Sequence, residues 1–137
     1  MNPLRPFAPY AHWLLRLALG SVFLYHGITK FPALGGLAEM MGMPVFMVGL
    51  LATAETVGAV FILVGGGGWD WMTRVGGLLI APIMLGAIFM VHLQHGWNSV
   101  NMGSGNMGRG MEFQVTLLMI ALYFLVVGNR RVEPEAA

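Results

Sequence analysis

The sequence predicts an all-α fold, an integral membrane four-helix bundle formed by a single domain over residues 1–137. Two observations lead to this fold class. Charged residues make up only 9% of the chain and apolar residues 57%, whereas a soluble domain uses about 25% charged residues to cover its surface. The apolar residues also gather in four long segments that lack the alternating pattern of a barrel strand. We therefore expect the outer surface to face a lipid bilayer.

Each apolar segment is long enough to cross a membrane as a helix. The segments cover residues 13–29, 45–64, 75–93 and 111–128. At about 17 to 20 residues each and ~1.5 Å per residue, they match a hydrocarbon core of ~30 Å. Helices are expected because lipid offers no hydrogen bonds to the backbone. Pro82 lies inside the third segment and should kink it, and a short disordered tail should follow the fourth.

The distribution of cations predicts the orientation of the chain. Four spans place both termini on the same side of the membrane. That side carries more lysine and arginine than the other: Arg5, Arg74, Arg130 and Arg131, against Lys30 and Arg109. The positive-inside rule then places both termini in the cytoplasm. A net charge of +1 with scattered cations predicts no nucleic-acid surface.

One stripe of the first helix combines charged and small residues. Arg16, Gly20, Phe23, Gly27 and Lys30 are spaced by 4, 3, 4 and 3 residues, so they share one helical face. Glycines on such a face allow a second helix to approach closely. We therefore expect this face to be packed and its charges to point inward, with the nearby His26 beside Lys30.

A carboxylate lies near the middle of the second span. Glu55 at that depth costs roughly 2.5–3.5 kcal/mol on insertion scales unless it is paired or neutral. It should turn toward the bundle interior, where Arg16 and Lys30 are its expected partners.

Four helices threaded in, out, in and out bring further polar residues to the outer end. The third segment ends with His92 and His95, and the fourth begins with Glu112. Together with His26 and Lys30 they should lie at one level, with Glu55 below. The sequence thus predicts a polar pocket that opens toward the outer leaflet.

Each of these residues has a structural alternative. Long cationic side chains can snorkel to the interface, and a buried histidine can bond a backbone carbonyl. His95 could lie among the lipid headgroups, and Glu112 could cap the fourth helix. Glu55 could belong to an ion pair that locks the bundle. No metal is predicted: His92 and His95 are weak candidate ligands whose spacing lacks a zinc-binding motif.

In their order along the chain, these motifs resemble the DoxX family of small bacterial membrane proteins. The stretch "RLALGSVFLYHGITKF" carries the family's Arg-Leu-x-Leu-Gly … His-Gly-x-x-Lys pattern. "AETVGAVFILVG", "VHLQHGW" and "GRGMEF" resemble the elements that follow it. The resemblance implies a multi-pass bundle in the bacterial inner (cell) membrane. It also implies a link to membrane oxidoreductase systems, because the relatives that give the family its name are linked to thiosulfate:quinone oxidoreductase.

The leading functional hypothesis is a quinone-linked subunit of a membrane oxidoreductase, whose outer-facing pocket holds a quinone or a small sulfur-type substrate. Electrons would pass to or from a soluble redox partner or another membrane subunit, because the chain contains no evident cofactor of its own. The alternatives are a non-catalytic accessory or assembly protein, including a homo-oligomer, and proton-coupled transport of a small solute. The residues expected to be catalytic are Glu55, His26 and Lys30; those expected to bind the substrate or quinone are Arg16, Phe23, His92, Trp97 and Glu112.

Overall fold

The computed structural model describes residues 3–100 and 108–130, and most of these residues are helical. These residues contain no strand, and the prediction of an all-α fold is confirmed for them. The expected tail lies outside the described residues from position 131 onward. In chain order the elements are η1 (Arg5–Tyr10), α1 (His12–Lys30), η2 (Phe31–Ala33), α2 (Leu34–Met41), α3 (Val45–Gly65), α4 (Asp70–Ala87), η3 (Ile88–His92), η4 (Leu93–His95) and α5 (Glu112–Val127).

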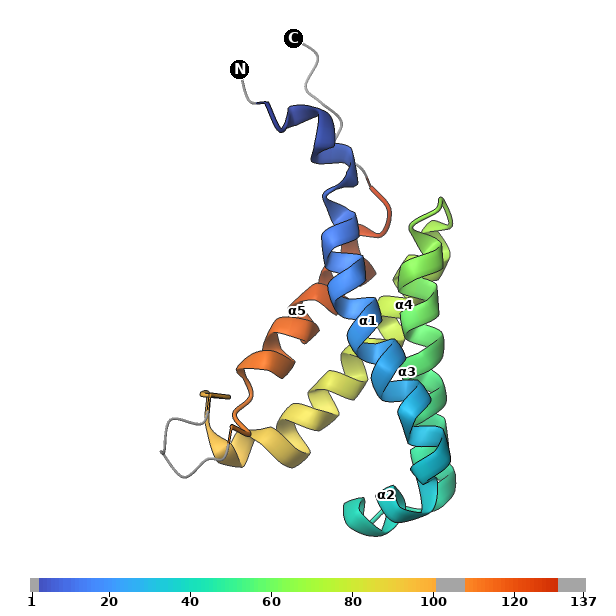
Figure 1. Cartoon of the computed structure of the whole chain (residues 1–137), viewed down its shortest axis with the longest axis vertical. Helices are drawn as coiled ribbons and strands as arrows, with labels where there is room; N and C mark the ends of the chain where they lie inside the picture. The colour runs from blue at the N-terminus through green and yellow to red at the C-terminus, as the bar shows by residue number, and fades with distance from the viewer. Residues whose placement is uncertain (1–2, 101–107, 131–137) are drawn as a thin grey trace.

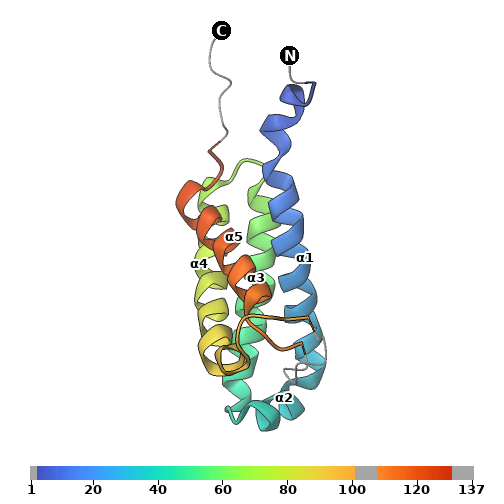
Figure 2. The same cartoon turned by 90° about the vertical axis from the view of Figure 1, so that its left-hand side faces the viewer.

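The four long helices run alternately down and up (Figure 1). Helix α1 packs on α3, α3 on α4 and α4 on α5, whereas α1 and α5 make few contacts with each other. The short helix α2 crosses the lower end and leads back into α3 (Figure 2). The first and last described segments therefore lie at the same, upper end of the molecule, as expected for an even number of long helices.

Local sequence signals set the ends of several helices. Helix α2 ends at Gly42, which has a φ of 62° and whose N–H bonds the carbonyl of Glu39; glycine is favoured in this left-handed conformation. Pro44 then precedes α3. Helix α4 runs through Pro82 to Ala87 and continues as the π-helix η3. A π-helix shifts the direction of the side chains that follow, so this segment determines where His92 points.

The core lies between α1, α3, α4 and α5. Leu19, Ala59, Ile62, Ile80, Ala121 and Phe124 are fully buried there, and Phe23, Leu117 and Leu118 nearly so. Helices approach closely at glycines: a Cβ atom placed on Gly77 would lie 2.6 Å from the carbonyl oxygen of Ala121. The sequence therefore positions the helices through small residues at the crossings and large apolar residues around them.

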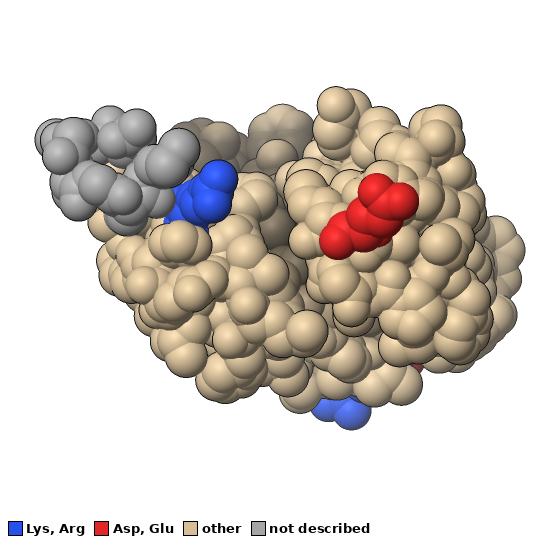
Figure 3. All heavy atoms as spheres, turned by 90° about the horizontal axis from the view of Figure 1, so that it is seen from below, with Lys and Arg blue, Asp and Glu red and all other residues tan. Residues whose placement is uncertain are grey.

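The outer surface of the bundle is strongly apolar. Large apolar side chains on all four long helices are exposed, among them Leu14, Tyr25, Phe46, Leu78, Phe89 and Val126. Among the described helices, α3 and the continuous stretch Asp70–His95 are long and apolar enough to cross a membrane. Helix α5 is apolar but has only 16 residues, and the histidines and cations of α1 lower its mean hydropathy. The lower end of the molecule also shows few charged side chains (Figure 3).

Candidate functional site

A nearly buried ion pair joins α1 to α3. The ammonium nitrogen of Lys30 lies 2.5 Å from Oε2 of Glu55, and Glu55 is only 4% exposed. Lys30 also donates to the backbone carbonyl of His26 at 3.2 Å. The expected pairing of Lys30 with Glu55 is therefore confirmed. It satisfies a carboxylate that would otherwise be costly at this depth.

Close helix packing brings the two charges together. Gly27 of α1 lies against α3, where an added Cβ atom would be 2.7 Å from the backbone nitrogen of Thr56 and 3.0 Å from the carbonyl oxygen of Ala52. Only a glycine allows this approach. Along the stripe predicted from the sequence, Arg16, Gly20, Phe23 and Gly27 are all buried. The stripe is therefore the packed face of α1.

The expectation that Arg16 would also pair with Glu55 is wrong. Arg16 is fully buried but bonds the carbonyl of Ile62 at 2.5 Å and the hydroxyl of Thr73 at 2.9 Å, near the upper end of the bundle. Fourteen residues separate Arg16 from Lys30, about 21 Å along a helix. Because α1 and α3 are antiparallel, Lys30 lies level with Glu55 while Arg16 lies level with the end of α3.

Two other predicted residues do not face an open pocket. The His26 imidazole is exposed on α1, and its ring centroid lies 5.8 Å from that of the Tyr25 ring. It lies one residue before Gly27, and this step rotates it about 100° away from the packed face. Phe23 is 2% exposed and belongs to the hydrophobic core. It is thus unavailable for stacking on a ligand in this conformation, because neighbouring apolar side chains already cover its ring.

A second polar group lies where the chain passes from α4 to α5. The Nδ1 atom of His92 is 2.7 Å from the carbonyl oxygen of Arg109, and since a carbonyl only accepts, this nitrogen must carry the proton. The carboxylate of Glu112 accepts the N–H of Ser99 at 2.9 Å. The Glu112 carboxylate therefore holds Ser99 against the start of α5, so its role goes beyond capping the helix.

The same loop is pinned to α5 through its backbone. The N–H groups of Met111 and Glu112 donate to the carbonyls of Gly96 and Trp97 at 3.0 and 3.1 Å. Gly110 allows this approach, because a Cβ atom there would lie 2.2 Å from the carbonyl oxygen of Asn98. Residues 96–98 and 110–112 thus pack against each other beside the start of α5 and form the floor of a hollow.

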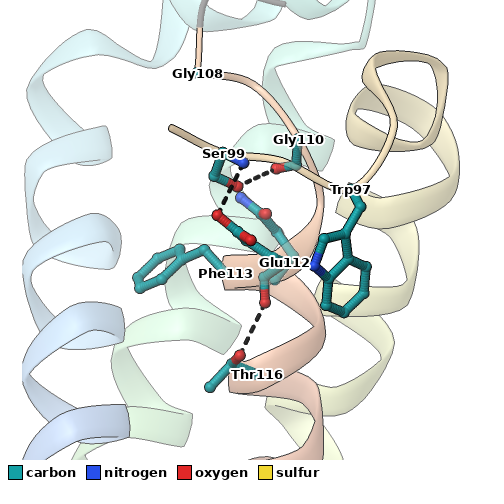
Figure 4. A pocket seen from close by; sticks show the side chains of 8 residues that line it. Trp97, Ser99, Gly108, Gly110, Glu112, Phe113 and Thr116 are labelled. Carbon is teal, nitrogen blue, oxygen red and sulfur yellow. Dashed lines mark hydrogen bonds between the residues drawn. The ribbon is translucent and has the colours of Figure 1, made fainter. Parts of the chain in front are cut away.

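An open hollow of about 610 Å³ lies on this floor (Figure 4). Two exposed aromatic rings, Trp97 (57% exposed) and Phe113 (47% exposed), form part of its wall. Glu112 and Gln114 contribute polar groups, and Oε1 of Gln114 is buried without a hydrogen-bond partner in the part of the chain that the structure describes. The residues that line the hollow are Trp97, Ser99, Gly108, Gly110, Glu112, Phe113, Gln114 and Thr116.

The predicted site residues therefore divide into separate groups. Lys30 and Glu55 pair between α1 and α3, and neither lines the hollow. Trp97 and Glu112 do line it. His92 and His95 lie on the adjoining helical turns, and within residues 3–100 and 108–130 no three potential metal-binding side chains come together.

Sequence reasoning missed a polar network at the upper end. The amide oxygen of Asn129 accepts from Arg16 at 2.6 Å and from Thr73 at 2.7 Å, and its amide nitrogen donates to the carbonyl of Gly65 at 2.7 Å. Asp70 accepts the N–H of Asn129 and pairs with Arg74. This network ties together the ends of all four long helices. Position 129, at the start of the predicted tail, gave no signal of this role.

Comparisons with known proteins agree with the sequence motifs. A protein of Bacillus subtilis (strain 168) named "Putative oxidoreductase CatD" is 31% identical over 120 residues, which cover 85% of this chain and 78% of that protein. A Haemophilus influenzae protein named "Uncharacterized protein" is 26% identical over 136 residues, covering 93% and 90%. No solved structure matches the chain. The DoxX family model matches residues 11–93, more than half of the chain, and the protein therefore belongs to the DoxX family.

Proposed function

We propose that this protein is a quinone-binding subunit of a membrane oxidoreductase system. It would cross the bacterial inner membrane four times, with both termini in the cytoplasm and the lower end of Figure 1 facing outward. The apolar exterior of all four long helices supports a lipid environment. The similarity to a relative named as an oxidoreductase supports the reaction class.

The hollow beside α5 is the observation that carries the proposal. A quinone needs apolar, preferably aromatic walls for its ring and a small number of polar groups for its oxygen atoms. Trp97 and Phe113 supply exposed rings, and Glu112 and Gln114 supply the polar groups. A small anionic sulfur compound fits less well, because the hollow is lined by a carboxylate and, among the described residues, by no lysine or arginine.

The Lys30–Glu55 pair is proposed to take part in proton exchange at the same end of the bundle. Carboxylates and amines are among the side chains that exchange protons with substrates in enzymes, and Lys30 and Glu55 form an ion pair between α1 and α3. His26 would join this exchange only if its ring turned inward. Electrons must come from or go to a partner, which we propose is a soluble redox protein or another membrane subunit.

The structure weakens one form of the accessory hypothesis. A homodimer would need small residues that face a second copy, and Gly20, Gly27 and Gly58 on α1 and α3 each pack against a helix of their own chain. Their surfaces are therefore already occupied. Transport through the bundle likewise has little support, since Glu55 lines neither of the two hollows identified at the ends of the described structure.

Native mass spectrometry of the detergent-solubilised protein tests the proposal. We expect the wild-type protein to carry a bound quinone from the cell membrane. Trp97→Ala should lose most of it, because the exposed indole would no longer cover the ring. Trp69→Ala is the matched control: Trp69 is similarly exposed, at 54%, but lies at the opposite end. A wild-type protein without quinone, even after incubation with a short-chain benzoquinone, would rule the proposal out.

A further inference from the structure

The hollow beside α5 presents hydrogen-bond acceptors that have no donor among the described residues. Oε1 of Gln114 is buried and has no partner within residues 3–100 and 108–130, which is unfavourable for an amide oxygen. Gln114 also lines the hollow. The terminal torsion of a glutamine side chain is soft, so a small rotation can turn this oxygen toward a ligand. A ligand that donates a hydrogen bond would remove the unfavourable state.

Glu112 supplies a second acceptor. One of its carboxylate oxygens receives the N–H of Ser99. The other has no partner among the residues that the structure describes. An ionised carboxylate only accepts hydrogen bonds, and Ser99 holds this one at the edge of the hollow. Its free oxygen therefore favours a donor as well.

The hydroxyl donors around the hollow are already used. Ser99 Oγ donates to the carbonyl of Gly110 at 2.7 Å, and Thr116 Oγ1 donates to the carbonyl of Glu112 at 2.9 Å (Figure 4). The indole of Trp97 is exposed, and its N–H bonds no other described residue, so it can donate to a ligand. A ligand group that both donates and accepts would therefore fit these surroundings better than one that only accepts.

From this arrangement we infer that the hollow selects the reduced, hydroquinone form of a quinone over the oxidised form. The inference rests on the proposed function and specifies its ligand. A hydroquinone hydroxyl donates to Glu112 or Gln114 and accepts from Trp97. A quinone carbonyl only accepts, so it can accept from the Trp97 indole or the Gln114 amide nitrogen. It cannot donate to the free oxygen of Glu112 or to the buried oxygen of Gln114. The aromatic walls stack on either form, and the selectivity comes from the acceptors.

Preference for one redox form changes the potential of the bound couple. A tenfold tighter binding of hydroquinone raises the two-electron midpoint potential at the site by about 30 mV relative to the free couple. A preference of about tenfold is expected if one additional hydrogen bond to a charged or buried acceptor forms only with the reduced ligand.

Isothermal titration calorimetry tests the inference directly. The full-length protein in nanodiscs is titrated under argon with duroquinone and, separately, with durohydroquinone, and empty nanodiscs serve as the blank. We expect durohydroquinone to bind about tenfold more tightly. Gln114→Leu should reduce this preference severalfold, whereas Gln114→Glu, which keeps an acceptor, should retain it. Gln94→Leu is the matched control, because Gln94 is exposed, does not line the hollow and donates to the carbonyl of Val91.

The outcomes separate this inference from the proposed function. Equal binding of the two forms, or tighter binding of duroquinone, overturns the selectivity but leaves a quinone site in place. An unchanged preference in Gln114→Leu, with its helical circular dichroism intact, also overturns it. If neither form binds, both the inference and the proposed function fail.

Discussion

Replacing Arg16 with alanine is expected to destabilise the fold by about 3–5 kcal/mol. The guanidinium group is fully buried and donates to the carbonyl of Ile62, the hydroxyl of Thr73 and the amide oxygen of Asn129. It also lies over the ring of Phe124, 4.7 Å from the centroid. Its removal leaves several acceptors without a donor and opens a cavity where the four helices meet.

Thermal unfolding in detergent, followed by circular dichroism, measures this effect. Arg130→Ala is the control, because it removes a cation from an exposed position at the same end, and surface charges contribute little to stability. Arg16→Lys should be intermediate, since lysine keeps the charge but cannot reproduce the planar fork of donors. If Arg16→Ala and Arg130→Ala unfold at the same temperature, the upper network does not hold the helices together.

Replacing Gly27 with alanine should also be strongly destabilising, by about 3 kcal/mol. The added Cβ atom would meet the backbone nitrogen of Thr56 and the carbonyl oxygen of Ala52 at 2.7 and 3.0 Å. Backbone atoms of a packed helix cannot move aside as a flexible side chain can. The two helices must therefore separate, which also pulls Lys30 away from Glu55.

Gly49→Ala is the control, and its expected effect on stability has the opposite sign. No heavy atom lies within 4 Å of a Cβ atom placed on Gly49. Alanine is a better helix former than glycine by roughly 1 kcal/mol, so this change in α3 should be neutral or stabilising. The same unfolding measurement applies. Equal effects at Gly27 and Gly49 would mean that close packing of α1 on α3 does not govern stability.

Periodicity, and the position of Glu55 in the middle of an apolar segment, were sufficient to predict the packed face of α1 and the Lys30–Glu55 pair. A 4-3-4-3 spacing defines one helical face whatever the partner, and a carboxylate in the middle of a long apolar segment needs a counter-charge. The bounds of the long helices also lie near the predicted segments, because composition changes abruptly at Pro44 and at the glycine-rich turn before Trp69.

Other features depend on contacts that no local pattern reveals. Arg16 was expected to pair with Glu55 but bonds Ile62, Thr73 and Asn129, because the stripe predicts the packed face of α1 and not the level at which each partner lies. The hollow depends on the backbone pairing of residues 96 and 97 with residues 111 and 112. Asn129 joins the upper network only because α5 ends beside α3 and α4. The residues that make each of these contacts are distant in sequence, so the contacts depend on the tertiary fold.

The central claim is that the ring of a quinone lies in the hollow between Trp97 and Phe113. Photolabelling with a short-chain benzoquinone that carries an aryl azide, followed by mass spectrometry of the peptides, tests it most directly. We predict labelled residues within 97–99 or 110–116, and loss of the label when excess unmodified quinone competes. Label confined to the opposite end, around His12, Gly66 and Asn129, or label that competition does not reduce, would contradict the claim.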